Sequence, residues 1–139
     1  MKTIYKNVIA VLFCAILVTP LQAQDPYHFI LGQEELAAID VYDINQTIDG
    51  KYWIATNNGM YRYDGYSFTK FEHEETLSNS FFNVIKNHDD VIHFNNLNGQ
   101  IFKIVGEKME LAHAIPDSLL SPYISFDFLK NNDLVVRAL

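Results

Sequence analysis

Histidine is the residue type in this chain best suited to metal binding or proton transfer. The five histidines are His28, His73, His88, His93 and His113. Only His88 and His93 stand close together in sequence, and a zinc site needs a third and usually a fourth ligand at a set geometry. No spacing of that kind is present, so we expect no metal site and interpret His88 and His93 as surface residues of a hairpin.

Carboxylates offer two further kinds of chemistry, calcium binding and glycoside hydrolysis. The acidic residues that come into question are Asp40, Asp43, Asp89, Asp90 and Asp133. The alternating acids and central glycine of a helix–loop–helix calcium site are absent, and turn chemistry alone accounts for acidic residues at hairpins. A pair of carboxylates acting as acid and base of a glycosidase stays open as an alternative.

Motifs for nucleophilic catalysis or phosphate binding are absent from the sequence. There is no Gly-x-Ser-x-Gly, no phosphate-binding loop and no His-Glu-x-x-His. The one cysteine, Cys14, lies in the apolar stretch near the N-terminus. We therefore predict no catalytic residue, no cofactor and no metal for this segment.

Aromatic side chains make up 14% of the chain, and such rings either stack on sugars or pack between sheets. The set that needs weighing is Tyr52, Trp53, Tyr61, Tyr63, Tyr66 and Phe68. The residue type and position of Trp53 favour core packing. Tyr66 and Phe68 lie nearer to an outer strand, so we do not expect them at a central ligand site.

These side chains are positioned by a repeat of strands and turns. Asp49-Gly50 recurs as Asp89-Asp90, and Asn58-Gly59 recurs as Asn98-Gly99. A period of about 40–45 residues built from short strands is typical of β-propeller blades. We therefore predict an all-β fold of four-stranded antiparallel meanders, amounting to about two and a half blades of an incomplete propeller.

The expected strands follow from the turn signals between them. In the first blade, residues 41–71, they are Val41–Ile48, Lys51–Thr56, Met60–Tyr63 and Tyr66–Phe71, and Asp49-Gly50 is expected to form a two-residue hairpin turn. In the second blade, residues 81–111, they are Phe81–Lys86, Val91–Asn95, Gln100–Val105 and Lys108–Leu111. A partial third blade, residues 123–139, holds Tyr123–Leu129 and Leu134–Leu139. Gln33–Ala38 is expected to form a short helical turn.

The strand patterns indicate sheets that are covered on both faces. A sheet with one wet face alternates apolar and polar residues. Here Tyr52-Trp53-Ile54-Ala55 is apolar on both faces, and so are Phe81-Phe82 and Ile101-Phe102. Blades stacked between neighbours account for this pattern.

The N-terminus predicts export. Lys2 and Lys6 precede an apolar run, Val8–Val18, and the stretch ends at Ala23, which is the layout of a signal peptide over residues 1–23. The run is about half as long as the ~20 residues of a membrane-spanning helix. An uncleaved membrane anchor is the alternative, and a lipid anchor at Cys14 is disfavoured because Phe13 precedes it.

The net negative charge of the chain argues against nucleic acid as a partner. Loss of Lys2 and Lys6 with the signal peptide takes the formal net charge from −7 to −9. A nucleic-acid surface needs a basic patch, so no nucleic acid is expected to bind this segment. The C-terminal apolar run, Leu134–Leu139, is expected to continue into further strands of a longer protein, because an unpaired apolar edge promotes aggregation.

The segment from Asp49 to Gly65 resembles the two-component-regulator propeller repeat. That repeat runs roughly D-x-x-G-x-x-W-[IF]-G-T-x-x-G-[LI]-x-[RK]-[YF]. The residues taken as blade-motif residues, with a structural role, are Asp49, Gly50, Trp53, Thr56, Gly59, Arg62 and Tyr63. The second repeat matches loosely: His93 stands near the tryptophan position, and Asn95-Asn96 replaces Ala55-Thr56.

The resemblance implies a function. Repeats of this family usually form the periplasmic sensor of bacterial receptors, followed by one membrane span and a histidine kinase or DNA-binding output. It implies an oligosaccharide or other small ligand, a homodimeric full-length protein, and an extracytoplasmic sensor segment that is not itself catalytic. Two alternatives stay open, an exported propeller enzyme acting on polysaccharide and a secreted structural or adhesion module.

Overall fold

The computed structural model describes residues 30–121 and 124–138, and every described strand belongs to one compact unit that begins at Gly32. The described residues are all-β and form antiparallel sheets, as the sequence predicts. The predicted signal peptide, residues 1–23, lies outside the described residues, and so does Tyr123, the first residue of the predicted third blade.

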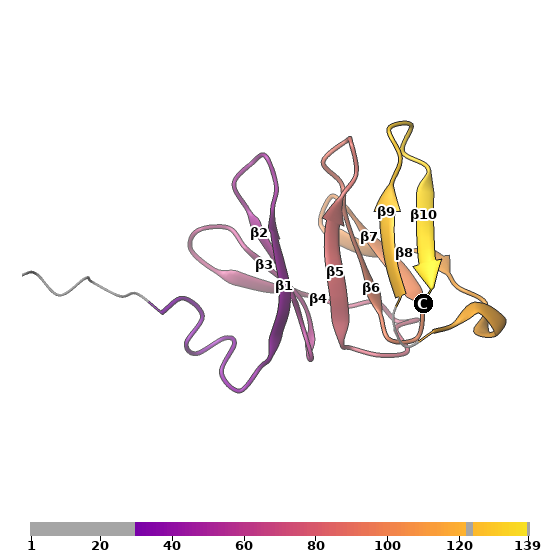
Figure 1. Ribbon diagram of the computed structural model, residues 1–139. Helices are drawn as coiled ribbons and strands as arrows, with labels where there is room; N and C mark the ends of the chain where they lie inside the picture. The colour runs from indigo at the N-terminus through magenta and orange to yellow at the C-terminus, as the bar shows by residue number, and fades with distance from the viewer. Residues whose placement is uncertain (1–29, 122–123, 139) are drawn as a thin grey trace, which may run out of the picture. The chain divides into compact units, whose positions relative to one another are not determined.

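The first sheet contains four strands in the order in which they follow along the chain (Figure 1). They are β1 (Val41–Gln46), β2 (Tyr52–Thr56), β3 (Gly59–Tyr63) and β4 (Phe68–Phe71). Neighbouring strands are antiparallel, with Trp53 opposite both Asn45 and Arg62. The predicted four-stranded meander is therefore present, although β1 and β4 are shorter than expected.

The turn between β1 and β2 is not the two-residue turn predicted for Asp49-Gly50. Its three residues, Ile48–Gly50, are closed by the N–H of Thr47, which donates to the carbonyl oxygen of Lys51 at 3.0 Å. The N–H of Gly50 donates to the carbonyl oxygen of Thr47 at 2.9 Å, and Gly50 has a φ of +84°. A hydrogen-bonded turn followed by a left-handed residue is the geometry of a three-residue hairpin loop.

The second sheet repeats the first. It contains β5 (Phe81–Lys86), β6 (Ile92–Asn96), β7 (Gln100–Val105) and β8 (Lys108–Ala114), again in chain order and antiparallel. β8 runs three residues beyond the predicted end at Leu111. The first strands of both sheets contain a register shift, between Val41 and Asp43 in β1 and between Phe82 and Ile85 in β5.

The remaining elements are short. β9 (Ile124–Phe128) and β10 (Leu134–Ala138) form a two-stranded antiparallel sheet, here called the C-terminal hairpin. A single 3₁₀ turn, η1 (Asp117–Leu119), precedes it. The helical turn expected over Gln33–Ala38 is present as consecutive hydrogen-bonded turns, in which the N–H of Leu36 donates to the carbonyl oxygen of Gly32 at 2.9 Å.

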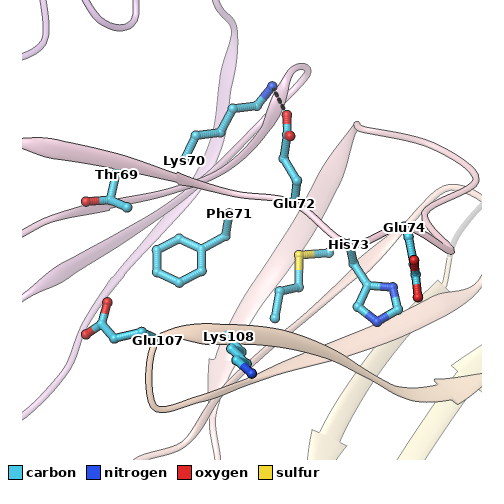
Figure 2. Close-up of a pocket in the computed structure, with 9 residues that line it drawn as sticks. Thr69, Lys70, Phe71, Glu72, His73, Glu74, Glu107 and Lys108 are labelled. Atoms are coloured by element: carbon cyan, nitrogen blue, oxygen red, sulfur yellow. Dashed lines mark ion pairs between the residues drawn. The ribbon is translucent and has the colours of Figure 1, made fainter.

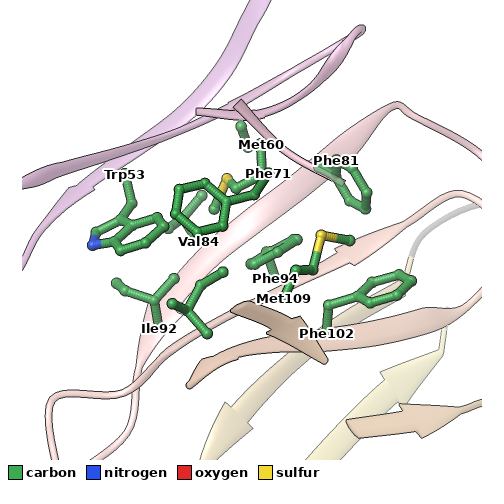
Figure 3. Close-up of a cluster of buried hydrophobic side chains, with 11 residues drawn as sticks. Trp53, Met60, Phe71, Phe81, Val84, Ile92, Phe94, Phe102 and Met109 are labelled. Atoms are coloured by element: carbon green, nitrogen blue, oxygen red, sulfur yellow. The ribbon is translucent and has the colours of Figure 1, made fainter. Parts of the chain in front are cut away.

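The main apolar core lies between the first and second sheets (Figure 3). Its buried members are Trp53, Ala55, Met60, Phe71, Phe81, Val84, Ile92, Phe94, Phe102, Ile104 and Met109. The ring of Phe81 meets the rings of Phe94 and Phe102 edge-on, at centroid distances of 5.1 and 5.6 Å. Edge-to-face contact at this spacing is favourable for aromatic rings, so these three rings, all from the second sheet, pack together on the face that it presents to the first sheet.

The second sheet is covered on both faces. Ile101 and Phe102 are neighbours in β7 and point to opposite faces, yet both are fully buried. Phe102 faces the first sheet in the core cluster, while the C-terminal hairpin places Phe128 against His93 on the other face. The predicted two-sided burial is therefore confirmed for this sheet.

The first strands of the three sheets lie beside one another. The Nδ2 of Asn45 donates to the carbonyl oxygen of Val84 at 2.9 Å, and the N–H of Val84 donates to the Oδ2 of Asp43 at 2.8 Å. The Nδ2 of Asn83 donates to the carbonyl oxygen of Ile124 at 2.9 Å. Side-chain hydrogen bonds therefore connect β1 to β5 and β5 to β9.

Candidate functional site

Asp49 and Gly50 occupy the turn between β1 and β2. The Oδ2 of Asp49 lies 2.7 Å from the Nζ of Lys51, and the hydroxyl of Thr47 donates to the Oδ1 of Asp49 at 2.7 Å. These two hydrogen bonds, that from Lys51 being the stronger influence, lower the pKa of Asp49 to about 2. Asp49 therefore stays negatively charged, and its hydrogen bonds stabilise the turn in which it lies.

Trp53 and Arg62 lie at the interface between the first two sheets. Trp53 is buried, with 4% of its surface exposed, which agrees with the packing role expected for it. The guanidinium carbon of Arg62 lies 5.8 Å from the centroid of the Trp53 ring and 5.4 Å from that of Phe71. Its Nη1 donates to both carboxylate oxygens of Glu107 in the second sheet, at 2.7 Å each. Arg62 therefore joins the two sheets by stacking and by an ion pair.

Thr56 and Gly59 shape the turn between β2 and β3. The buried hydroxyl of Thr56 donates to the carbonyl oxygen of Gly59 at 2.7 Å and accepts from the N–H of Asn58 at 3.0 Å. Gly59 has a φ of +130°, and a Cβ there would lie 2.7 Å from the side chain of Lys70. These two residues therefore form the β2–β3 turn and contribute no exposed polar group to a binding site.

Tyr63 lies at the end of β3. Its hydroxyl donates to the carbonyl oxygen of Gly65 at 2.7 Å, and its ring lies 4.8 Å from that of Phe68. The seven motif residues are thus distributed over three turns and one interface of the first sheet. The structure does not bring them together into one site.

The three hairpins that begin the sheets share one turn form, which sequence reasoning missed. Asp90 (φ +60°) and Asn132 (φ +64°) take the left-handed place that Gly50 takes in the first turn. The N–H of Asp90 donates to the carbonyl oxygen of Asn87 at 3.1 Å, and that of Asn132 to Leu129 at 2.8 Å. Gly, Asp and Asn are the residues that most readily adopt this conformation. Their recurrence about every 40 residues was therefore the sequence signal that could have predicted the shared turn form.

Side chains connect each of these turns to the turn before it. The Oδ2 of Asp90 accepts from the N–H of Ile48 at 2.8 Å, and the Oδ1 of Asn132 accepts from the N–H of His88 at 3.0 Å. The Nδ2 of Asn132 also donates to the Oδ2 of Asp89 at 2.7 Å. We call Thr47–Lys51, Asn87–Val91 and Leu129–Asp133 the turn row. The three hairpins point the same way in Figure 1.

A cleft of about 470 Å³ opens between β4 and the turn that joins β7 to β8 (Figure 2). It is lined by Thr69–Glu74, from β4 and the segment that follows it, and by Glu107–Met109, from the β7–β8 turn and the start of β8. The Nζ of Lys70 pairs with Glu72 at 2.8 Å, and the hydrogen bond from Arg62 lowers the pKa of Glu107. A lowered pKa suits a structural anion and not a general acid.

A second cleft, also of about 470 Å³, lies between the second sheet and the C-terminal hairpin. Its lining includes His93, Lys103, Glu110, His113 and Phe128. His93 is buried, with 8% of its surface exposed, so the expectation of two surface histidines is wrong for His93. The physical reason is that the C-terminal hairpin covers the face of β6 on which His93 lies.

A partly exposed aromatic pair lies on the first strands of the first two sheets. The ring of Tyr42 in β1 lies 4.6 Å from the ring of Phe82 in β5, with an angle of 16° between the ring planes. Tyr42 is 46% exposed although it belongs to a strand. Sequence reasoning did not select either residue, because their stacking depends on how β1 and β5 are placed.

Two classes of site are not found in the described part of the chain. No group of three or more His, Cys, Asp or Glu side chains is arranged to hold a metal ion among residues 30–121 and 124–138. Within the same residues, none of the helical segments has the length and apolar character of a membrane span. Comparison with protein-family models, with curated proteins and with solved structures finds no match to this chain.

Proposed function

We propose that residues 24–139 are the N-terminal part of a β-propeller domain that senses a ligand outside the cytoplasm. In this proposal 41–71 and 81–111 are blades and 123–139 begins a third. The segment itself is not catalytic. It belongs to a two-component receptor with a histidine kinase or hybrid regulator output, and the full-length protein acts as a homodimer.

The observation that carries the proposal is the repeated turn row. Three hairpins with the same hydrogen-bonded turn begin three successive sheets, and the same kind of side-chain bond connects each turn to its predecessor. Repetition of one supersecondary unit, each contacting its neighbours, is the organisation of propellers. The signal-peptide pattern supports export, to the periplasmic face of a membrane or beyond.

The ligand class we propose is an oligosaccharide. Sugar rings present apolar C–H faces that pack well on flat aromatic rings, and Tyr42 stacked on Phe82 offers such a surface. Binding would change the receptor only if the ligand has different affinities for two arrangements of the dimer. The signal would then pass through the membrane to the kinase.

The first test is the gene sequence downstream of Leu139. We expect further repeats, then a membrane helix and a histidine kinase or DNA-binding domain. A reading frame that stops at Leu139 would overturn both the propeller and the receptor. A downstream region with no membrane span would favour the exported enzyme instead.

The second test is binding by the complete ectodomain. Oligosaccharides from a plant and algal glycan library should include at least one ligand, and Tyr42→Ala should weaken its binding about tenfold, the loss typical of an aromatic anchor. Tyr66→Ala is the matched control, because Tyr66 is 97% exposed and lies in the turn between β3 and β4, outside the strands that carry Tyr42 and Phe82. Equal loss from both variants would contradict the proposed binding surface.

A further inference from the structure

His93 holds the place in the second sheet that Trp53 holds in the first. Trp53 is opposite Asn45 and Arg62, and His93 is opposite Ile85 and Lys103 in the same register. An aromatic ring stacked under a guanidinium in the first sheet is thus replaced by an imidazole opposite an ammonium. The neutral imidazole tolerates this neighbour, whereas the imidazolium is repelled by it.

The packing around His93 fits the neutral ring. The ring of Phe128 lies 4.6 Å away at 59°, so one side of the imidazole contacts an apolar surface of β9. The Nδ1 lies 3.0 Å from the carbonyl oxygen of Val91, which assigns the proton of the neutral ring to Nδ1. No carboxylate of the described residues pairs with His93, so an imidazolium there would have no counter-ion in contact.

The charged groups around this cleft come from three elements. Burial of the ring is the largest cause of the lowered pKa of His93, and the bond to Val91 raises this pKa. Lys103 of β7 and His113 of β8 lower it further. The carboxylate of Glu110 lies 3.5 Å from the Nζ of Lys103, and Asp133 lies on the hairpin wall of the cleft.

We propose that His93 is a pH-sensitive latch that holds the C-terminal hairpin on the second sheet when it is neutral and releases it when it is protonated. The proposal rests on the register, the Phe128 contact and the opposing Lys103, and it holds whatever the ligand or output of the protein.

The sign of the effect follows from proton linkage. The pKa of His93 in the folded chain lies below its ordinary value of 6.5, so the unfolded or released state binds the proton more tightly. The attachment of the C-terminal hairpin to the second sheet is therefore at full strength above about pH 6.5. It weakens as the pH falls from there through the pKa that His93 has in the folded chain. Because a single proton is involved, the equilibrium constant for attachment of the hairpin falls by at most about tenfold per pH unit.

The test is hydrogen exchange of β9 and β10 amides in the full-length protein at pH 7.5 and 5.5, corrected for the intrinsic pH dependence of exchange. We expect protection of these amides to fall at pH 5.5 relative to β2 and β3. His93→Phe should abolish this extra fall, because phenylalanine keeps the ring contact with Phe128 and does not titrate.

A second variant keeps the test decisive if His93→Phe does not fold. Lys103→Met removes the opposing charge and should raise the pKa of His93 towards its ordinary value, so the fall in protection at pH 5.5 should become smaller, with NMR titration of the His93 ring as an independent readout. His88→Gln is the control, because His88 lies in an exposed turn, and it should keep the wild-type behaviour. Equal protection of wild type at both pH values, or an unchanged fall in His93→Phe, would overturn the latch.

Discussion

Arg62 illustrates, at the scale of the residue, how one side chain joins two sheets. It is only 11% exposed, whereas its partner Glu107 is 71% exposed. An ion pair with one partner in water contributes little to stability. Stacking of a desolvated guanidinium on two rings contributes more, so the contacts with Trp53 and Phe71 are expected to dominate.

Arg62→Lys tests this ranking. Lysine keeps the charge but loses the planar stack, so the free energy of unfolding should fall by about 1–2 kcal/mol. Glu107→Gln removes only the ion pair and should cost less than about 1 kcal/mol. Urea unfolding of both variants in the complete ectodomain measures the difference, and an equal or larger loss in Glu107→Gln would reverse the ranking.

Asp49 provides a pH prediction at the same scale. Its pKa of about 2 lies below the ordinary 3.8, so its contribution to stability is present above about pH 4 and is lost as the pH falls towards 2. Lys51→Met removes the largest cause of the shift and should raise the pKa of Asp49 towards 3.8. Carboxyl NMR titration measures it. A pKa that stays near 2 in Lys51→Met would assign the shift to Thr47.

At the scale of the element, the turn row sets how hairpins are joined. Asn132→Gly keeps the left-handed backbone but removes the bonds to His88 and Asp89, so it should lower the free energy of unfolding by about 0.5–1.5 kcal/mol. Lys130→Gly is the matched control in the same turn, where no side-chain bond is lost. If both cost the same, chain flexibility and not the inter-turn bond explains the loss.

The strands and the positions of most turns between them were predictable, but the form of the turn between β1 and β2 was not. Alternation of strand residues and turn signals placed all ten strands in the described part of the chain, with errors at their ends. Ile48 was assigned to a strand because it is β-branched, yet it lies in a loop and is 88% exposed. Asp-Gly is compatible with two- and three-residue hairpin loops, so this dipeptide alone does not decide between them.

The candidate sites were less predictable than the strands, because they depend on contacts between sheets. Glu107 lies far along the chain from Arg62, and nothing in its local sequence marks it as a partner. His93 is polar and was assigned to the surface, but the C-terminal hairpin buries it. Residues at such interfaces are identified only when the placement of neighbouring sheets is known.

At the scale of the whole molecule, the second sheet is central because it packs on both neighbours. Phe94→Ala should therefore lower the free energy of unfolding by about 3–5 kcal/mol, since Phe94 is fully buried beside Phe81 and Phe102. Tyr66→Ala, at a residue that is 97% exposed, should change it by less than about 0.5 kcal/mol. Calorimetry of the complete ectodomain would contradict this if Phe94→Ala unfolds as wild type.

The direction of the bonds in the turn row has a consequence for biosynthesis. Ile48 and His88 each receive their partner from a residue 42 or 44 positions later, Asp90 and Asn132 respectively. A ribosome synthesises the N-terminal residues first, so each hairpin is made before the side chain that completes its turn. The inter-turn hydrogen bond of each hairpin therefore forms only after the next repeat has been synthesised. A pause in translation after the first sheet would leave the N–H of Ile48 without the Asp90 side chain until elongation resumes.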